Sequence, residues 1–105
     1  MMTIRQVIGY QGRTNKDPDS CYSFWVGGSL SMLGLFCDSD LPSTESFLLG
    51  QCQSNPYLGG FSKLPDTYPD ALHSFYSICW LSMAQSSGLR AIDARLGICR
   101  DRFQL

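Results

Sequence analysis

The feature of this chain that most limits its possible folds is an internal repeat with a period of 51 residues. Aligned with itself at that offset, the chain places Gly9 over Gly60, Pro18-Asp19 over Pro69-Asp70, Ser23-Phe24 over Ser74-Phe75, and Leu30-Ser31-Met32 over Leu81-Ser82-Met83. Each copy has a glycine-containing loop, a Pro-Asp helix start and an apolar run, which predicts helices over residues 19–35 and 70–85. A period of this length is typical of stacked helical repeats.

The segment between these helices predicts a third, shorter one. Residues 43–54, STESFLLGQCQS, combine hydroxyl residues and Glu45 with an apolar run, as a capped helix start does. We therefore expect each unit to be an αα hairpin, with units at about residues 9–58 and 60–88 of one domain covering residues 1–105. The tail, residues 89–105, loses the pattern and is expected to be a last amphipathic helix or an unpacked end, without an assigned function.

Composition and charge exclude several classes of partner. The 105 residues allow one domain, and the net charge of −1 gives no basic field, so nucleic acid is not expected as a partner. The chain has no apolar run of membrane-spanning length and no signal-peptide pattern at its start, so we expect no transmembrane segment and a cytoplasmic location. Only 16% of the residues are charged, which indicates that part of the apolar surface faces other protein.

The cysteines do not form the pattern of a disulfide framework. There are five of them, an odd number, widely spaced and without a Cys-x-x-Cys pair. Most are expected to be buried thiols that act as small apolar side chains. A cysteine that binds metal must therefore be identified by its neighbours.

Three side chains at the predicted helix starts form a candidate metal site. Asp19 and Cys21 are two residues apart, so they can converge only at a helix end. His73, the single histidine, occupies the repeat position equivalent to Tyr22, and side-by-side repeats would bring the two helix starts together. Three ligands of these types with an open fourth position are typical of catalytic zinc. The alternatives are a simple helix cap for Asp19 and a core or capping role for His73.

Two stretches of the sequence resemble a known family. GYQGRTNKDPDSCYSFWVGG (9–28) and LGGFSKLPDTYPDALHSFYSICWLS (58–82) are similar to the C-terminal part of the β subunits of protein prenyltransferases, most closely the type I geranylgeranyl enzymes. The resemblance covers roughly residues 9–83. It implies an all-α fold, an α/α barrel (toroid) of repeated helical hairpins, of which this chain would be an incomplete C-terminal portion.

The same resemblance implies an activity. It points to transfer of a geranylgeranyl group from geranylgeranyl diphosphate to the cysteine thiol of C-terminal CaaX proteins of the small-GTPase type. It also implies one Zn²⁺ per β subunit and an α subunit as heterodimer partner. Two other interpretations stand beside it: a non-catalytic remnant that only binds zinc or the α subunit, and a farnesyltransferase or Rab-type geranylgeranyltransferase β subunit.

Residue roles follow from the matching motifs. The resemblance assigns the zinc ligands to Asp19, Cys21 and His73, the diphosphate contacts to Arg13, Lys16 and Tyr22, the lipid and peptide pockets to Trp25 and Tyr76, and the contact with the substrate's last residue to Leu72. Plainer interpretations are solvated loop charges for Arg13 and Lys16, and core packing for the two aromatic residues.

Lys63 occupies a position at which the resemblance implies a difference between the geranylgeranyl and the farnesyl enzymes. In the farnesyl-transferring relatives an aspartate at the matching position helps to hold magnesium against the diphosphate. A lysine ammonium neutralises developing phosphate charge directly, so magnesium is not expected to be required. Lys63 is therefore expected to act in catalysis with Tyr22 and to bind the donor; the alternative is a surface lysine in a fixed loop.

Overall fold

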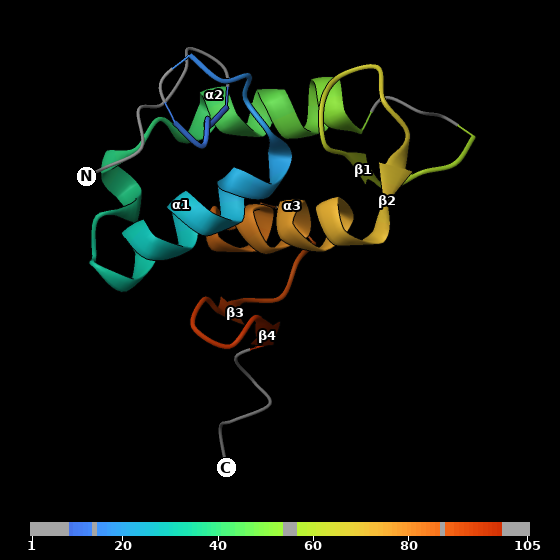
Figure 1. Ribbon diagram of the computed structural model, residues 1–105. Helices are drawn as coiled ribbons and strands as arrows, with labels where there is room; N and C mark the ends of the chain where they lie inside the picture. Colours follow the sequence, from blue (N-terminus) through green and yellow to red (C-terminus); the bar gives the residue numbers. More distant parts are fainter. Residues whose placement is uncertain (1–8, 14, 54–56, 87, 100–105) are drawn as a thin grey trace.

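Two helices of equal length occupy equivalent positions of the repeat and lie side by side (Figure 1). In this computed structural model, which describes residues 9–13, 15–53, 57–86 and 88–99, α1 spans Ser20–Met32 and α3 spans Ala71–Met83. Each follows an aspartate whose carboxylate accepts a backbone N–H: Asp19 from Cys21 and Asp70 from His73. The Pro-Asp starts therefore predicted the helix beginnings correctly.

Both helices end before the predicted residues 35 and 85. The backbone turns into the left-handed region at Gly34, with φ of 76°, and at Gln85, with φ of 60°. These two positions are also 51 residues apart, so the repeat includes the helix ends. A residue in this conformation stops the helical hydrogen-bond pattern, which is why the helices are shorter than their apolar runs.

The connection between α1 and α3 is largely helical. It contains η1, a 3₁₀ turn at Phe36–Asp38, then α2 at Leu41–Ser46, which runs directly into η2, a π-helix at Phe47–Cys52. The predicted short helix is present, but its cap is Asp40, whose carboxylate accepts the N–H of Ser43 at 3.2 Å. The prediction that the hydroxyl residues at 43–44 cap this helix was therefore wrong, because the helix already begins at Leu41.

A small ladder fixes the start of α3. β1 at Phe61–Ser62 pairs antiparallel with β2 at Pro69–Asp70, so that Phe61 lies opposite Asp70. The first repeat has the equivalent link, since Asp19 donates its N–H to the carbonyl of Tyr10 at 2.9 Å. Tyr10 and Phe61 are both buried. An aromatic residue in the loop thus anchors each helix start to the core.

The tail forms a β-hairpin. β3 at Ile92–Asp93 pairs with β4 at Ile98–Cys99, and Figure 1 shows this hairpin beside α3, on the side away from α2. The expectation of a final helix or an unpacked end was therefore wrong for residues 89–99. Residues 100–105 lie outside the described part of the chain. Gly97, with φ of 68°, permits the turn into β4.

The core lies where α1, α3 and η2 meet. Trp80 is its largest fully buried side chain, and its ring centroid lies 5.8 Å from that of Phe36. Room for the indole comes from Gly27 of α1, where a Cβ atom would lie 2.7 Å from Trp80 Cδ1. The contact between α1 and α3 therefore depends on a glycine facing a tryptophan.

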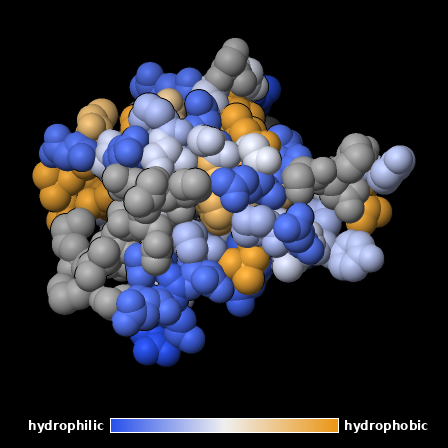
Figure 2. All heavy atoms as spheres, turned by 90° about the horizontal axis from the view of Figure 1, so that it is seen from above, coloured by the Kyte–Doolittle hydropathy of each residue, from blue (hydrophilic) through white to orange (hydrophobic). Residues whose placement is uncertain are grey.

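Part of the apolar surface of α1 and α3 remains exposed. Trp25, Leu72, Phe75 and Ile78 each leave roughly half of their area to solvent, and Figure 2 shows further apolar side chains gathered in patches on one face of the molecule. The helices are thus apolar on more sides than this chain covers. None of the helices in the described residues is long and apolar enough to cross a membrane.

Candidate functional site

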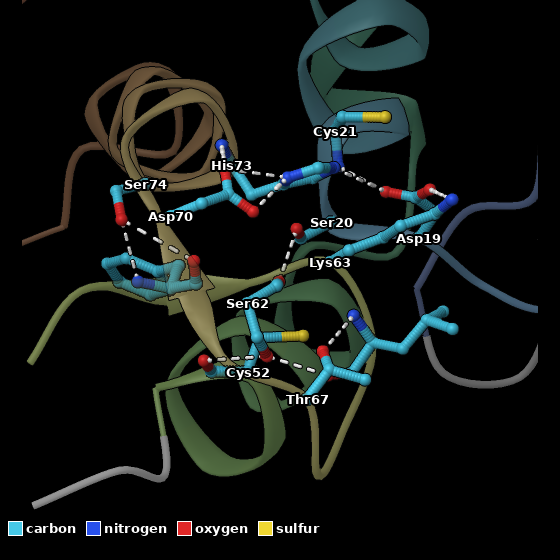
Figure 3. Close-up of polar contacts among 12 residues, drawn as sticks. Asp19, Ser20, Cys21, Cys52, Ser62, Lys63, Thr67, Asp70, His73 and Ser74 are labelled. Atoms are coloured by element: carbon cyan, nitrogen blue, oxygen red, sulfur yellow. Dashed lines mark hydrogen bonds and ion pairs between the residues drawn. The ribbon is translucent and has the colours of Figure 1, made fainter. Parts of the chain in front are cut away.

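The helix starts bring the three predicted metal ligands together (Figure 3). Asp19 caps α1, Cys21 lies in its first turn, and His73 lies in the first turn of α3. One ligand atom from each of the three lies within 4.8 Å of the others. His73 Nε2 is 3.6 Å from Asp19 Oδ1. His73 lies 52 residues after Cys21 in the sequence. It joins Asp19 and Cys21 in one cluster because α1 packs beside α3.

Asp70 holds the imidazole of His73. Its two carboxylate oxygens lie 2.9 and 2.8 Å from His73 Nδ1, while the same carboxylate accepts the His73 backbone N–H at 2.8 Å. These hydrogen bonds hold the pKa of Asp70 below its ordinary value, and the bond from the His73 backbone N–H has the largest effect. A proton on Nδ1 leaves the Nε2 lone pair facing Asp19, as in the carboxylate–histidine pairs of metal sites.

The thiol of Cys21 remains protonated at neutral pH in this environment. Burial raises its pKa to about 12, and the adjacent Asp19 adds to the rise through a hydrogen bond and its negative charge. A divalent cation among the three donors would offset that charge and favour the thiolate. Sulfur, imidazole nitrogen and carboxylate oxygen are the ligands that zinc takes in proteins, so these residues suit Zn²⁺.

Buried hydroxyl groups connect the cluster to the loop that carries Lys63. The Ser20 backbone N–H donates to the Lys63 carbonyl at 3.0 Å, and Ser20 Oγ donates to the Ser62 carbonyl at 2.7 Å. Ser62 Oγ donates to the Leu64 carbonyl at 2.7 Å and also lies 3.2 Å from the Cys52 carbonyl. Ser20 and Ser62 are almost completely buried. The Lys63 loop is therefore fixed against the first turn of α1.

Lys63 itself contacts a member of the metal cluster. Its Nζ lies 3.8 Å from Asp19 Oδ2, and its side chain remains 58% exposed while that of Asp19 is 9% exposed. Because the ammonium is largely solvated, the ion pair adds little stability. Its effect is positional: the ammonium lies at the boundary between the metal cluster and the pocket beside it.

That pocket contains the predicted diphosphate contacts. It has a volume of about 380 Å³ and is lined by Gly12, Arg13, Lys16, Asp17, Asp19, Tyr22, Lys63 and Leu64. All four residues assigned to the diphosphate, namely Arg13, Lys16, Tyr22 and Lys63, are among them. Three cations against two carboxylates leave the lining with a formal charge of +1. The pocket thus offers a guanidinium, two ammonium groups and a phenol to an anion next to the metal cluster.

Gly12 makes room for the phenol ring. A Cβ atom at this position would overlap the Tyr22 ring, and would lie 2.5 Å from its hydroxyl oxygen. A side chain at Gly12 would therefore push Tyr22 out of the pocket. The sequence signal for this role was weak, since Gly12 stands in the GRTNK motif but has no functional group.

The two predicted aromatic residues, one from α1 and one from α3, are in contact with each other. The rings of Trp25 and Tyr76, which are equivalent in the repeat, have centroids 4.9 Å apart. Phe24 stacks on Tyr76 at 5.0 Å, and Phe75 lies 5.4 Å from it. Trp25 is half exposed, whereas Tyr76 is partly buried, so the plainer interpretation as a core residue stays open for Tyr76. Leu72 is also exposed, in the first turn of α3, and does not line the 380 Å³ pocket.

Sequence reasoning missed Asp70 and the two phenylalanines of this aromatic cluster. Asp70 had been interpreted only as a helix start. Its equivalence to Asp19 in the repeat and its spacing of three residues from His73 were signals that could have identified it. Phe24 and Phe75 are repeat-equivalent as well, and that symmetry predicts that they share a surface.

Comparison with known proteins places this arrangement in a family. The pattern of the prenyltransferase alpha-alpha toroid domain matches residues 2–98. The geranylgeranyl transferase type-1 subunit beta of Arabidopsis thaliana is 41% identical over 90 residues, 86% of this chain and 23% of the relative. The protein farnesyltransferase subunit beta of Saccharomyces cerevisiae is 37% identical over 88 residues, 80% of this chain and 20% of the relative.

A solved structure shows the same fold. A chain of Candida albicans protein geranylgeranyltransferase-I complexed with GGPP superposes with a TM-score of 0.84 at 34% identity, over 99% of this chain and 30% of that chain. This chain therefore spans less than a third of the length of these relatives. The α/α toroid expected from the motifs is confirmed, and the chain belongs to the prenyltransferase α/α toroid family.

Proposed function

We propose that this chain carries the metal-binding and diphosphate-binding part of a protein geranylgeranyltransferase type I β subunit. In this proposal it acts with an α subunit, and a geranylgeranyl group passes from geranylgeranyl diphosphate to the cysteine of a CaaX protein. The observation that carries it is the position of Lys63. Its ammonium lines the cationic pocket and lies 3.8 Å from Asp19 of the metal cluster.

The residues of the pocket would stabilise the leaving group. As the bond between the allylic carbon and the diphosphate oxygen breaks, negative charge accumulates on that oxygen. Arg13 can donate two parallel hydrogen bonds to phosphate oxygens, and Tyr22 can donate one. Lys16 and Lys63 supply point charges to the same group. These interactions strengthen as the charge develops, so they favour the transition state over the bound donor.

The neighbouring cluster would position the nucleophile. Asp19, Cys21 and His73 would hold zinc, and a bound zinc lowers the pKa of an acceptor cysteine thiol so that it reacts as a thiolate. Asp70 keeps the imidazole of His73 oriented. Trp25 and Tyr76 would contact the lipid or the peptide, and the exposed Leu72 would contact the substrate's last residue.

Lys63 also argues for the geranylgeranyl enzyme against the farnesyl enzyme. A carboxylate at this position would repel a diphosphate unless a divalent cation lay between them, whereas the ammonium attracts it directly. We therefore expect the chain to bind inorganic diphosphate without magnesium. Changing Lys63→Asp should weaken that binding about tenfold without magnesium, the effect of one charge interaction worth about 1.4 kcal/mol, and millimolar magnesium should largely restore it.

Calorimetric titration of the full chain with inorganic diphosphate, with and without magnesium, measures this. The matched control is Arg95→Asp, which makes the same charge change on a side chain paired with Asp93 outside the pocket, and it should leave diphosphate binding unchanged. A second measurement is geranylgeranyl transfer to a CaaX peptide by the chain in complex with an α subunit. There Lys63→Asp should slow transfer and make its rate rise with magnesium.

The outcomes separate the candidate functions. A wild-type chain that needs magnesium, or a Lys63→Asp variant without effect, contradicts the role of Lys63 and favours the farnesyl-type alternative. Zinc and diphosphate binding without any transfer in the α-subunit complex favours the non-catalytic remnant. Transfer of the lipid by the α-subunit complex to a Rab protein, and not to a CaaX peptide, favours the Rab-type alternative.

A further inference from the structure

A second pocket lies away from the metal cluster, between α3 and the β3–β4 hairpin. It has a volume of about 470 Å³ and an almost wholly apolar lining formed by Phe75, Ile78, Cys79, Ile92, Gly97, Ile98 and Cys99. It contains two of the five cysteines, one from each of the elements that form it. Neither cysteine belongs to the metal cluster or the cationic pocket.

The two thiols differ in accessibility. Cys79 is only 3% exposed, in the middle of α3, whereas Cys99 is partly exposed at the end of β4, where it pairs with Ile92. Both are free thiols in the structure. Both side chains line the same pocket. Burial raises the pKa of Cys79 to about 11, and the charge of Cys99 adds to that rise. A solvent-borne oxidant would therefore meet Cys99 first.

The hairpin that carries Cys99 has short strands and few attachments to α3. Each strand has two residues, and a two-stranded hairpin of this size is at best marginally stable by itself. It is tied to α3 where Ser82 Oγ donates to the Arg90 carbonyl, and by Gly97, at which a Cβ atom would lie 3.3 Å from the Phe75 ring. A disulfide requires the two Cα atoms to lie about 4.4–6.8 Å apart, and a hairpin with so few attachments can move relative to α3 to adjust that separation.

We propose that Cys79 and Cys99 form a reversible disulfide that fastens the β3–β4 hairpin to α3. Hydrogen peroxide is the oxidant. The Cys99 thiolate attacks one peroxide oxygen and releases hydroxide, which gives a sulfenic acid. The Cys79 sulfur then attacks the Cys99 sulfur and displaces the hydroxyl group, which leaves as water with the Cys79 proton. Two thiols and one peroxide thus yield one disulfide and two waters, and a dithiol reductant reverses the bond.

The folded structure, and not chain proximity, would select this pair. Cys37 and Cys52 are 15 residues apart, whereas Cys79 and Cys99 are 20 apart, so closure of the shorter loop is slightly favoured by entropy in the unfolded chain. In the fold, Cys37 is exposed in η1 and Cys52 is buried in η2, and neither lines the pocket between α3 and the hairpin. Pairing of Cys79 with Cys99 therefore reports the native arrangement.

Peptide mapping tests the proposal on the full chain. The folded chain is treated with hydrogen peroxide, remaining thiols are alkylated, and trypsin is added without reductant. Trypsin releases Cys79 in residues 64–90 and Cys99 in residues 96–100. We expect these two peptides to appear joined as the main linked pair and to separate on treatment with dithiothreitol. When oxidation is done in urea, they should be only one of several linked pairs, because loops of 15, 16 and 20 residues between neighbouring cysteines cost nearly the same to close.

Two variants sharpen the result. Cys37→Ser, the matched control, should leave the 64–90/96–100 link intact, whereas Cys99→Ser should remove it. Amide hydrogen exchange in residues 91–99 should slow at least tenfold in the oxidised wild-type chain, and should recover on reduction. The proposal is overturned if peroxide treatment of the folded wild-type chain converts Cys99 to a sulfinic acid or joins it to a different cysteine. This result does not depend on whether the Cys99→Ser variant folds.

Discussion

Asp70 shows how one side chain serves both the fold and the site. Its carboxylate accepts the His73 backbone N–H as the cap of α3 and also contacts His73 Nδ1 with both oxygens. Asparagine caps helices about as well as aspartate does, but it has no charge and only one acceptor oxygen. Changing this residue to asparagine therefore separates its two roles.

We predict that Asp70→Asn lowers zinc affinity by about tenfold or more, the usual loss for a residue that orients a metal ligand, while helix content stays the same. Titration of zinc against a chromophoric chelator measures the affinity, and circular dichroism measures the helix content. Asp40→Asn makes the same change at the cap of α2, and zinc affinity should not respond.

Cys21→Ala and His73→Ala, which remove ligands outright, should abolish zinc binding. Unchanged zinc content in Cys21→Ala would refute the metal assignment.

At the scale of secondary-structure elements, the packing of α1 on α3 positions the whole site. The metal ligands come from the N-termini of both helices, so a change in their separation alters the ligand distances directly. At one point of this contact the Trp80 indole lies directly over Gly27, where a Cβ atom would be only 2.7 Å from Trp80 Cδ1. The adjacent Gly28 has open space by comparison, since a Cβ atom there meets only Phe24 at 4.0 Å.

These neighbouring glycines give opposite predictions for one substitution. Gly27→Ala should lower the free energy of unfolding by about 1–3 kcal/mol, because the added methyl overlaps the buried indole. Gly28→Ala should raise it by up to about 1 kcal/mol, since alanine is the better helix former. Urea unfolding of both variants measures the difference. Equal effects at the two positions would mean that the Trp80 indole does not limit the space at Gly27.

At the scale of the whole molecule, zinc would join two halves of the chain. Its ligands come from α1 and from α3, so binding requires both repeats to be folded and packed. A ligand that binds only the folded state at a hundred times its dissociation constant adds about 2.7 kcal/mol. We predict that zinc raises the midpoint of thermal unfolding on the order of 10 °C in a chain of this size. Scanning calorimetry with zinc and with EDTA measures the shift, and a His73→Ala variant should show none.

Buried thiols also make the fold sensitive to alkali. Burial raises the pKa of Cys52 to about 12 and that of Cys79 to about 11, from an ordinary value of 9.0. The unfolded chain loses these protons first, so the stabilisation is complete below pH 9 and is lost as the pH rises towards 11–12. Metal-free chain should therefore unfold at lower urea concentration at pH 10.5 than at pH 8. A Cys79→Ala variant should show a shallower pH dependence, whatever its absolute stability.

The sequence by itself determined the helices and the members of the site. Repeated Pro-Asp pairs mark helix starts because an aspartate cap satisfies free N–H groups locally, and this interaction needs no tertiary contact. The spacing of Asp19 and Cys21 around such a start indicated convergence at a helix end. Motif resemblance supplied Arg13, Lys16, Tyr22 and Lys63, and the structure brings them into one pocket.

Only the tertiary structure decided how these parts meet. The approach of His73 to Asp19 depends on the packing of α1 beside α3, and the ion pair of Lys63 with Asp19 depends on the loop fixed by Ser20 and Ser62. The hairpin at residues 92–99 was not foreseen, because strands of two residues carry no periodic signal. Local hydrogen bonds can be inferred from residues that are neighbours in the sequence. Contacts across 40 residues or more, such as Ser20 with Ser62, depend on how side chains pack throughout the fold, and local sequence patterns do not reveal that packing.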